Sequence, residues 1–273
     1  MPYRLSAFAD EISSDIQVQM DHMLDNGVRF CTMRGANGKN VMEFEDFQVG
    51  IMKPQFFNRG IRFAAIGSPI GKIKITDPFE AEVERLKRAA ELAKGFETKV
   101  IRIFSFYIPE GDNPGKHQAE VMRRMKGLAD VAKAEGVNLE LENEKGIYGD
   151  IADRHLEILE TVNMPNLQAA FDFANFIEVG QDPLPAWAKL RKWVKDFHVK
   201  DCRKADRKVC PAGQGDGKIR EILKDAFATG WSGYLTLEPH LSAAGQFQGF
   251  TGAKLFKTAV DALKGILDEV GAK

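Results

Sequence analysis

The feature that most constrains the fold is a regular alternation of two kinds of segment along the whole chain. Eight times, a short run with the alternating pattern of a strand precedes a stretch whose apolar residues keep helical spacing. One such unit has its strand at residues 61–67 and its helical stripe from Val83 to Ala93, and Gly95 ends it. Eight strand–helix units in succession predict an α/β protein, a parallel (β/α)8 TIM barrel with its helices outside the strands.

The chain length of 273 residues fits one barrel of ordinary size, and no linker or low-complexity tract divides the sequence. We therefore expect a single domain over residues 1–273. A doubly wound open sheet is the alternative, but it would usually place a glycine-rich phosphate loop after the first strand. The segment FADEISSD at residues 8–15 lacks that pattern, so we favour the barrel.

Local signals also predict where several helices begin and end. Ser13 or Ser14 can cap the first helix, and Asp77 with the following proline can start the third. Pro54 lies inside the second helical pattern, where it predicts a kink or an early end. The sixth helix is expected to be short and to begin after Pro185.

Composition and charge exclude several classes of protein. The net charge of −1 gives no electrostatic reason to expect a nucleic-acid partner. The sequence shows neither an apolar run of membrane-spanning length nor a signal-peptide pattern, so we expect a cytoplasmic protein with no membrane partner. Cys31, Cys202 and Cys210 form no disulfide framework and no CxxC pair, which argues against a thiolate zinc site.

The last four predicted strands end in residue types that bind metal ions. Glu142, Asp172, His198 and Glu238 stand at the C-terminal ends of these strands. Side chains of a strand alternate between two faces, and in each strand the apolar neighbours fall on the opposite face. Neighbouring strands lie about 4.8 Å apart, so four inward side chains at one height can reach a single ion. Barrel enzymes also place their active sites at these strand ends.

Each of these residues alone has a simpler explanation. A glutamate at a strand end is often solvated, Asp172 could cap the next helix, and His198 could be a hydrogen-bonded core histidine. Three carboxylates that converge at one depth, however, would repel and raise each other's pKa unless a cation held them. We therefore expect one divalent metal ion, Mn²⁺, Mg²⁺, Co²⁺ or Zn²⁺, with Mn²⁺ preferred.

The same alternation predicts a second polar layer beneath the metal site. Glu140, Ala170, Asp196 and Thr236 should point toward the barrel axis there. Buried polar groups need partners, and Arg102 from the fourth strand is a candidate partner for this layer.

Several motifs give the chain a resemblance to known proteins. ENE at 142–144, FDFANF at 171–176, FHVKD at 197–201 and LEPH at 237–240 resemble motifs of the xylose isomerase-like TIM barrel superfamily. The segments FADEIS, MRGANGKNV and SPIGK are similar to its sugar phosphate isomerase/epimerase subgroup. The resemblance covers nearly the whole chain and implies a small carbohydrate as the substrate.

Carried over by position, the resemblance implies that Glu142, Asp172, His198 and Glu238 are the ligands of a single divalent metal ion. In the epimerases of this family, the two glutamates also face each other across the bound sugar and exchange its proton. Glu142 and Glu238 are therefore the implied catalytic pair.

The chain departs from the family pattern at two positions that would contact the substrate. Asn175 stands where many members have a histidine three residues after the aspartate. The basic clamp that follows the histidine of the seventh strand would fall at Arg203, with Lys204 and Arg207 as close competitors.

The superfamily also contains endonuclease IV-type DNA repair enzymes, which bind three zinc ions with many histidines. This chain has five histidines, of which His22, His117 and His155 fall on predicted helices or loops away from the strand ends. The positions that would need further imidazoles hold other residues: Ser68, Ser105, Asn175 and Lys208. We therefore expect neither a trinuclear site nor DNA repair.

We expect a metal-dependent isomerase or epimerase that acts on a keto-sugar or a sugar phosphate. A substrate carbonyl and an adjacent hydroxyl would chelate the ion, which would stabilise the enediolate formed when Glu142 or Glu238 removes a carbon-bound proton. The same enolate could instead lose a hydroxyl or alkoxy group, which would give a dehydratase or a lyase on keto-sugars or keto-glycosides. A metal-free barrel that serves as a binding subunit is the non-enzymatic alternative.

Other residues are candidates for contact with the substrate. Arg34 could bind a hydroxyl, carboxylate or phosphate, or it could form a salt bridge with the nearby acidic loop. Glu144 and His240 each follow a proposed ligand by two residues, so they could line the same pocket.

Two further segments are weaker candidates for the pocket. Phe104, Phe106 and Tyr107 could cover the apolar face of a sugar, although core packing explains some of them equally well. The PAGQGDG turn at residues 211–217 resembles a glycine-rich turn against a substrate, but it lacks the lysine pattern of a phosphate loop. The sequence leaves the oligomeric state open, and a homo-oligomer is one possibility.

Overall fold

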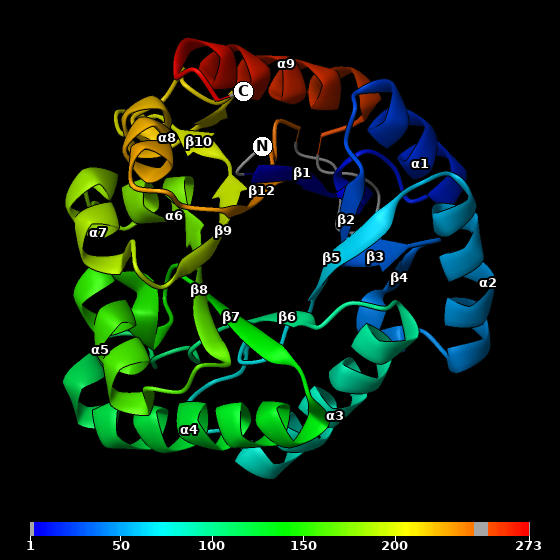
Figure 1. Ribbon diagram of the computed structural model, residues 1–273. Coiled ribbons are helices and arrows are strands. Elements are labelled where there is room, and N and C mark those ends of the chain that lie inside the picture. The colour runs from blue at the N-terminus through cyan, green and yellow to red at the C-terminus, as the bar shows by residue number, and fades with distance from the viewer. Residues whose placement is uncertain (1–2, 243–250, 273) are drawn as a thin grey trace.

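The chain folds into a closed barrel of eight parallel strands surrounded by helices (Figure 1). The structure, a computed structural model, describes residues 3–242 and 251–272. Along the chain, the barrel strands are β1 (Tyr3–Phe8), β2 (Phe30–Met33), β5 (Arg62–Gly67), β6 (Val100–Ile103), β7 (Asn138–Glu142), β8 (Leu167–Asp172), β9 (Val194–Val199) and β12 (Gly233–Leu237). The first and last of them, β1 and β12, pair in parallel and close the barrel. The predicted (β/α)8 barrel is therefore confirmed.

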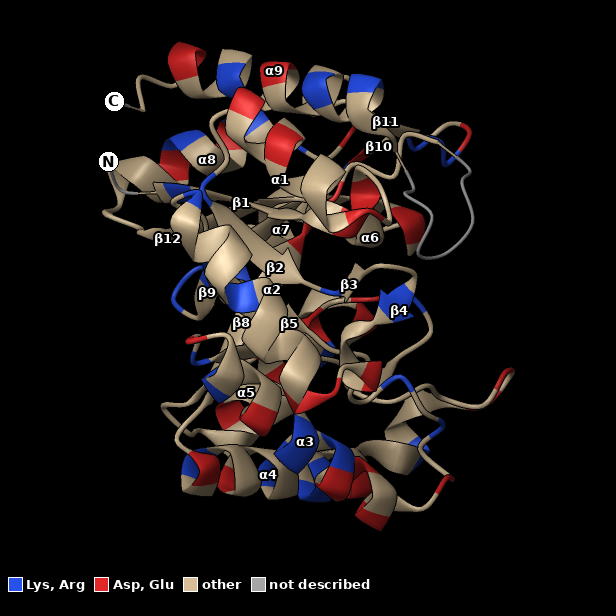
Figure 2. Cartoon of the chain, turned by 90° about the vertical axis from the view of Figure 1, so that its right-hand side faces the viewer, with Lys and Arg blue, Asp and Glu red and all other residues tan. Residues whose placement is uncertain are grey.

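The helices lie outside the strands, and acidic and basic side chains are mixed along the outer helices (Figure 2). They are α1 (Ile16–Asp25), α2 (Asp46–Asn58), α3 (Phe79–Gly95), α4 (Gln118–Glu135), α5 (Ala152–Val162), α6 (Phe173–Glu178), α7 (Pro183–Leu190), α8 (Ile219–Ala228) and α9 (Ala253–Glu269). Among the described residues, none of these helices combines the length and the apolar run that a membrane crossing requires.

Short elements decorate the loops between the barrel units. Four are 3-10 turns: η1 (Ala9–Glu11), η2 (Val41–Glu43), η3 (Pro114–His117) and η4 (Tyr148–Asp150). Two are small antiparallel hairpins, one of β3 (Gly35–Ala36) with β4 (Lys39–Asn40) and one of β10 (Asp201–Cys202) with β11 (Val209–Cys210). Both hairpins follow a barrel strand, so they belong to the loops at the C-terminal end of the barrel.

Two predicted helix starts are wrong by one or two residues. The N-cap of α1 is Asp15, whose side chain accepts hydrogen bonds from two backbone amides of the first turn, rather than Ser13 or Ser14. The residue before α3 is Pro78, whereas the Asp77 carboxylate accepts a hydrogen bond from the backbone of the preceding loop. At α1 the Asp15 carboxylate takes the capping role, whereas no side chain caps α3.

Two helix boundaries also differ from the prediction. Pro54 does not end α2 early, since this helix continues to Asn58 and has buried apolar residues on both sides of the proline. The sixth unit contains two short helices: α6 starts directly after Asp172, and α7 starts at Pro183 rather than after Pro185. A proline in the first turn is tolerated because its missing N–H would have no partner there.

The alternation of side chains in the barrel follows the predicted pattern. Leu139 and Leu141 of β7 belong to the core between strands and helices. In the polar layer, Thr236 Oγ1 of β12 donates to the Asp196 carboxylate of β9 at 2.8 Å, and both side chains are buried. Because a strand with one apolar face has only one register that buries it, this pattern also fixes which side chains reach the C-terminal end.

Candidate metal centre

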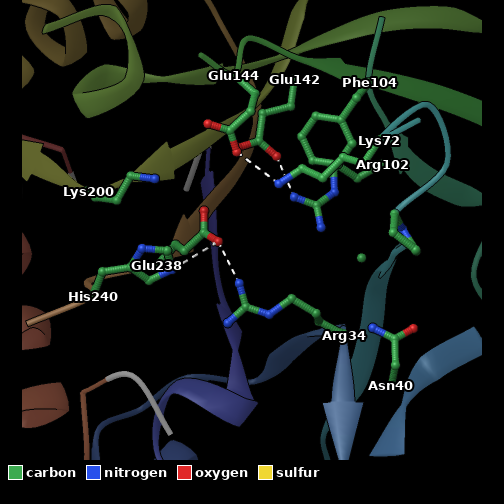
Figure 3. A pocket seen from close by; sticks show the side chains of 12 residues that line it. Arg34, Asn40, Lys72, Arg102, Phe104, Glu142, Glu144, Lys200, Glu238 and His240 are labelled. Carbon is green, nitrogen blue, oxygen red and sulfur yellow. Dashed lines mark hydrogen bonds and ion pairs between the residues drawn. The ribbon is translucent and has the colours of Figure 1, made fainter. Parts of the chain in front are cut away.

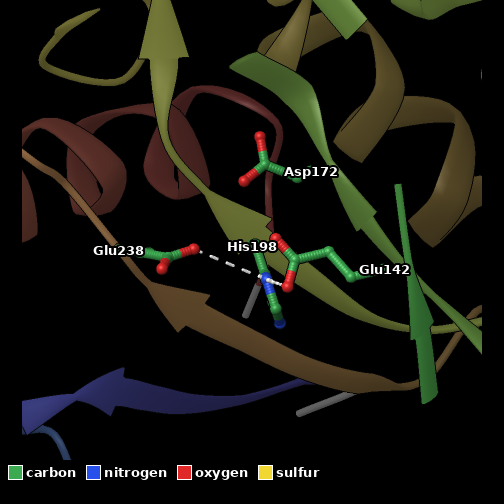
Figure 4. Close-up of side chains that lie close together, drawn as sticks. All are labelled: Glu142, Asp172, His198 and Glu238. Atoms are coloured by element: carbon green, nitrogen blue, oxygen red, sulfur yellow. Dashed lines mark ion pairs between the residues drawn. The ribbon is translucent and has the colours of Figure 1, made fainter. Parts of the chain in front are cut away.

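Four side chains at the C-terminal end of the barrel converge on one point (Figure 4). Glu142 and Asp172 end β7 and β8, His198 lies near the end of β9, and Glu238 directly follows β12. Each contributes one potential ligand atom, and these atoms lie within 4.8 Å of one another. All four residues are buried. The structure therefore brings together the four residues that were predicted as metal ligands.

Several buried atoms of this cluster lack a hydrogen-bond partner in the part of the chain that the structure describes. His198 Nδ1 lies 3.3 Å from Glu142 Oε2 and 3.6 Å from Glu238 Oε2, but without the geometry of a hydrogen bond. Glu238 Oε2 and Asp172 Oδ2 are likewise without one, although Lys200 Nζ forms an ion pair with Asp172 Oδ2 at 2.9 Å. Buried acceptors that face a shared centre are what a bound cation would satisfy.

The electrostatics of the cluster also favour a cation. Burial raises the pKa of Asp172 to about 7, although the Lys200 ammonium acts in the opposite direction. Burial opposes the charged form of His198, but Glu142 and other carboxylates outweigh it and raise the His198 pKa to about 9. The same cluster would bind a metal ion through the neutral imidazole, so metal binding should release a proton.

The donor set fits one divalent ion. Three carboxylates and one imidazole suit hard or borderline ions such as Mn²⁺, Mg²⁺, Co²⁺ and Zn²⁺, and they exclude none of these four. The three carboxylates would leave a net charge of about −1 around a divalent ion with a neutral imidazole. The protein would hold the ion through Glu142, Asp172, His198 and Glu238.

The polar layer below the cluster differs from the prediction in one respect. Asp196 and Thr236 are paired as expected, but Arg102 donates to Glu142 Oε2 at 2.5 Å rather than to Glu140. Burial raises the pKa of Glu140 well above its usual range. Such a shift favours the neutral carboxyl, which has less need of a cationic partner than a carboxylate has.

A cavity of about 180 Å³ opens beside the cluster at the C-terminal end of the barrel (Figure 3). Its walls combine acidic and basic side chains with the phenyl ring of Phe104. The lining residues are Arg34, Asn40, Gly67, Pro69, Lys72, Arg102, Phe104, Glu142, Glu144, Lys200, Glu238 and His240. Two members of the cluster, Glu142 and Glu238, thus reach the cavity, together with the predicted pocket residues Arg34, Glu144 and His240.

Arg34 is held by three carboxylates at one side of the cavity. Its Nε lies 2.7 Å from Asp10 Oδ2, its Nη2 2.9 Å from Glu11 Oε1 and its Nη1 2.6 Å from Glu238 Oε1. His240 Nε2 lies 3.0 Å from Glu11 and 3.4 Å from Glu238. Glu11, Glu238 and His240 form a second group with metal-ligand spacing, but the Arg34 guanidinium already supplies its cation. The salt bridge proposed for Arg34 is therefore present.

Asn175 supports the cluster from behind and does not line the cavity. It lies on α6, buried, and donates from Nδ2 to Asn143 O at 2.8 Å. The same nitrogen lies 3.4 Å from Glu142 Oε1. The backbone N–H of Asn175 donates to Asp172 Oδ1 at 2.8 Å. Asn175 therefore orients two of the proposed ligands, whereas the sequence suggested a contact with the substrate.

The structure does not bring Arg203 to the cavity. Arg203 lies in the loop between β10 and β11, is about half exposed and pairs with Asp206 at 2.9 Å. Its competitors Lys204 and Arg207 are exposed as well. The basic residue that reaches the cavity from this part of the chain is Lys200, which the prediction missed. Its position two residues after His198 places it on the same face of the chain, a signal that the sequence already contained.

The PAGQGDG turn binds a carboxylate of the protein itself. The amides of Gly213, Gly215 and Gly217 all donate to the side chain of Asp201, at 2.8 to 3.0 Å. A Cβ at Gly215 would lie 2.4 Å from Asp201 Oδ1, so the glycine is required for this approach. The idea that this turn cradles the substrate is therefore wrong.

The other candidates from the sequence lie as follows. Phe104 lines the cavity, Phe106 belongs to the core, and Tyr107 is half-buried without lining the cavity. His22 lies on α1, His117 ends η3 and His155 is buried on α5. Within the described residues, no second imidazole joins the cluster of Glu142, Asp172, His198 and Glu238.

Comparisons with known proteins place this geometry in a family. A curated relative, the 3-dehydroshikimate dehydratase of Bacillus anthracis, is 28% identical over 134 residues, which is 49% of this chain and 48% of the relative. The alignment thus spans about half the length of that relative. Because identity is modest and coverage partial, the activity in the name of this relative is not assigned to the chain.

Two solved structures are similar over nearly the whole chain. A D-tagatose 3-epimerase-like protein superposes with a TM-score of 0.79 at 15% identity and covers 98% of both chains. A xylose isomerase-like TIM barrel protein from Mycobacterium smegmatis in complex with magnesium has a TM-score of 0.71 at 15% identity, over 98% of this chain and 97% of its own. The family model described as xylose isomerase-like TIM barrel matches residues 22–266. The chain therefore belongs to the xylose isomerase-like TIM barrel family.

Proposed function

We propose that the protein is a divalent-metal-dependent isomerase or epimerase of a keto-sugar or sugar phosphate. The observation that carries the proposal is the presence of two buried glutamates, Glu142 and Glu238, which reach one cavity from different walls (Figure 3). Such a pair can remove a proton from a substrate carbon on one side and return it on another.

Both glutamates are held in the charged form that a base requires. Burial opposes ionisation of Glu142, but His198 and Arg102 outweigh it and keep the pKa of the Glu142 carboxyl below its usual range. Burial likewise opposes ionisation of Glu238, and Lys200, His240 and Arg34 outweigh it there.

The four-residue cluster includes both glutamates, so a metal ion bound there would lie next to the proposed acid–base pair. A divalent ion bound there would act as a Lewis acid toward a substrate carbonyl and stabilise negative charge on its oxygen. The residues of the chain do the remaining work. Arg102 orients Glu142, Arg34 orients Glu238, and the buried site limits access of water to the proton in transfer.

Exchange of substrate hydrogen with solvent tests the proposal. Ketohexoses incubated in D₂O with the Mn²⁺-loaded protein should take up deuterium at the carbon next to the carbonyl, visible by NMR. Glu142→Gln and Glu238→Gln should slow this exchange by about 10²- to 10⁴-fold, the usual effect of losing a general base. Glu160→Gln, at an exposed position of α5, is the matched control and should exchange at the wild-type rate. Full exchange by Glu142→Gln would remove this residue from the reaction.

Elimination is the second candidate, because it starts from the same removal of a proton. The similarity to a protein named as a dehydratase, at 28% identity over half the chain, favours this candidate. If the protein is a dehydratase or a lyase, keto-sugars or keto-glycosides should lose water or their aglycone in the same incubation. Exchange without such loss supports the isomerase or epimerase.

A further inference from the structure

One wall of the cavity carries two cationic groups, Lys72 and Arg102, of which the proposed proton transfer uses only Arg102, through its contact with Glu142. Lys72 Nζ lies 4.3 Å and Arg102 Cζ 4.4 Å from the centre of the Phe104 ring. The two cationic groups lie close together beside Glu142 and Glu144, and Arg34 and Glu238 face them across the cavity (Figure 3). This wall, formed by Lys72, Arg102 and Phe104, is called the cationic wall below.

The loop after β5 is built so that Lys72 is held in this wall. Gly71 has a φ of +85°, and a Cβ on it would lie 2.0 Å from Phe104 O, so only glycine fits. The Gly71 amide donates to the buried Glu82 carboxylate at 2.7 Å, and Phe104 N donates to Ile70 O at 2.8 Å. A buried carboxylate and a required glycine therefore fix the backbone next to Lys72.

Both cations keep hydrogen-bond donors in reserve. Lys72 Nζ forms an ion pair with Glu144 Oε2 at 2.9 Å. An ammonium has three donors, so donors remain for a ligand. Arg102 donates from Nη1 to Glu142, whereas its buried Nε has no partner in the described part of the chain. A guanidinium has five donors in a planar fork that matches an oxyanion.

Arg34, on the opposite side, is in a different state. Each of its three guanidinium nitrogens already contacts a carboxylate, from Asp10, Glu11 and Glu238. An anionic ligand near Arg34 would meet these three negative charges. Arg102, by contrast, donates to one carboxylate, that of Glu142, so more of its five donors remain for a ligand than in Arg34.

We propose that the substrate carries an oxyanion, a carboxylate or a phosphate, and that the cationic wall binds it. This rests on the proposed function and names the class of its substrate: a polyhydroxy carbonyl compound with an acidic group. Binding of that group by Lys72 and Arg102 would fix one end of the substrate and orient its carbonyl toward Glu142 and Glu238. A substrate held in this way would present its carbon in the orientation that proton transfer to and from the two glutamates needs.

Binding of three inert probes tests the proposal. Gluconate carries a carboxylate, glucitol 6-phosphate carries a phosphate, and glucitol is the neutral control. None of them has an aldehyde or ketone group, so none can undergo the proposed reaction. Titration calorimetry on the Mn²⁺-loaded protein should show at least one anionic probe binding roughly ten-fold or more tightly than glucitol. Lys72→Met should remove most of this preference, and Lys72→Arg should restore part of it.

Lys74→Met is the matched control, because Lys74 is exposed in the same loop and does not line the cavity. It should bind all three probes as the wild type does. A preference for gluconate alone identifies a carboxylate, and a preference for glucitol 6-phosphate alone identifies a phosphate. Chelation of Mn²⁺ by gluconate would not respond to Lys72→Met, so it is distinguished from the proposal.

Two results would overturn the proposal. The anionic probes would bind no better than glucitol, or Lys72→Met would keep the same preference as Lys74→Met. The function and the substrate class fail separately. If only the substrate class is wrong, the wild type will exchange deuterium on neutral ketohexoses but show no preference for anions. If only the proposed function is wrong, the wild type will show no exchange but will keep the measurable preference for anions.

Discussion

The carboxylate of Asp201 and the carboxylates of the proposed metal cluster are buried at the same end of the barrel, but they differ in how completely their oxygens are hydrogen-bonded. Asp201 is 1% exposed, and its oxygens accept four hydrogen bonds, from the backbone amides of Gly213, Gly215, Gly217 and Cys202. These amides tie the loop before α8 to the hairpin of β10 and β11. A carboxylate that serves the structure is thus satisfied completely by the backbone.

The cluster of Glu142, Asp172, His198 and Glu238 is equally buried but is not satisfied in this way. Carboxylate oxygens of Asp172 and Glu238 and a ring nitrogen of His198 lack hydrogen bonds within the described residues. Burial raises the pKa of Asp172 to about 7, so its charged form is costly in this setting. Several unsatisfied buried groups that face one centre therefore indicate a ligand site, because folding alone would favour the complete hydrogen bonding seen at Asp201.

Activity gives the largest contrast between the two sets. Asp172→Asn should lower kcat/KM by about 10³-fold, because it removes a proposed ligand of the ion that stabilises charge in the reaction. Asp201→Asn should retain kcat/KM within roughly ten-fold in the fraction that folds, because this side chain does not line the cavity. Steady-state kinetics on both variants provide the comparison. Equal losses in the two variants would erase the distinction between them.

Stability should show the reverse contrast. Asp201→Asn places an amide group against backbone amides, so it should lower the free energy of unfolding by about 3 kcal/mol. Gly215→Ala should act in the same direction, because its Cβ would lie 2.4 Å from Asp201 Oδ1. Asp172→Asn in the metal-free protein should change stability by less, about 1 kcal/mol, since it removes charge from a crowded cluster. Urea denaturation of the three variants measures these differences, and a larger loss at Asp172 would contradict the comparison.

Metal binding should stabilise only proteins with an intact cluster. At a Mn²⁺ concentration 100 times its Kd, the folded state gains about 2.7 kcal/mol, which raises Tm by roughly 5–10 °C for a chain of this size. Wild type and Asp201→Asn should both show the shift, and a chelator should reverse it. Asp172→Asn should show little of it in the same thermal scan. An unchanged Tm in the wild type would argue against a metal site.

His155 offers an intermediate case, a buried titratable group with one unsatisfied nitrogen. Burial lowers its pKa from 6.5 to about 4, and its Nε2 has no hydrogen-bond partner among the described residues. A lowered folded-state pKa means that its stability contribution is present above about pH 6.5 and is lost as the pH falls toward 4. His155→Phe should therefore lose less stability than the wild type over this interval, by about 3 kcal/mol. Identical pH dependence in both proteins would show that His155 titrates normally.

Arg203 should give the smallest effect. It is about half exposed and pairs with Asp206, so Arg203→Ala should change kcat/KM by less than about two-fold and stability by less than about 1 kcal/mol. Lys200→Ala is the informative counterpart, because Lys200 is buried beside Asp172 and lines the cavity. Steady-state kinetics on both variants provide the comparison. A loss of activity in Arg203→Ala but not in Lys200→Ala would support the substrate contact that the sequence suggested for Arg203.

The sequence predicted the barrel and the convergence of four side chains because both depend on local periodicity. Residues two apart on a strand share a face, and parallel strands of a barrel end at one rim. This reasoning placed Glu142 and Asp172 correctly, and it would have placed Lys200, two residues after His198, had it been extended by one step.

The remaining features of the site depend on contacts between distant segments, which no local pattern specifies. Arg34 binds carboxylates from a 3-10 turn and from the loop after β12. Arg102 donates to Glu142 rather than to Glu140, its neighbour across the strand pair, and burial raises the pKa of Glu140. Arg203 does not line the cavity, because it lies in the exposed loop between β10 and β11 and pairs with Asp206.

The four-residue cluster should hold one divalent ion, whereas the equally buried Asp201 should hold none. Elemental analysis of protein soaked in Mn²⁺ and freed of excess metal tests this most directly. The account predicts about one equivalent of metal in the wild type and in folded Asp201→Asn, and far less in Asp172→Asn. A metal content well below one equivalent in the wild type, or an equal content in Asp172→Asn, would contradict it.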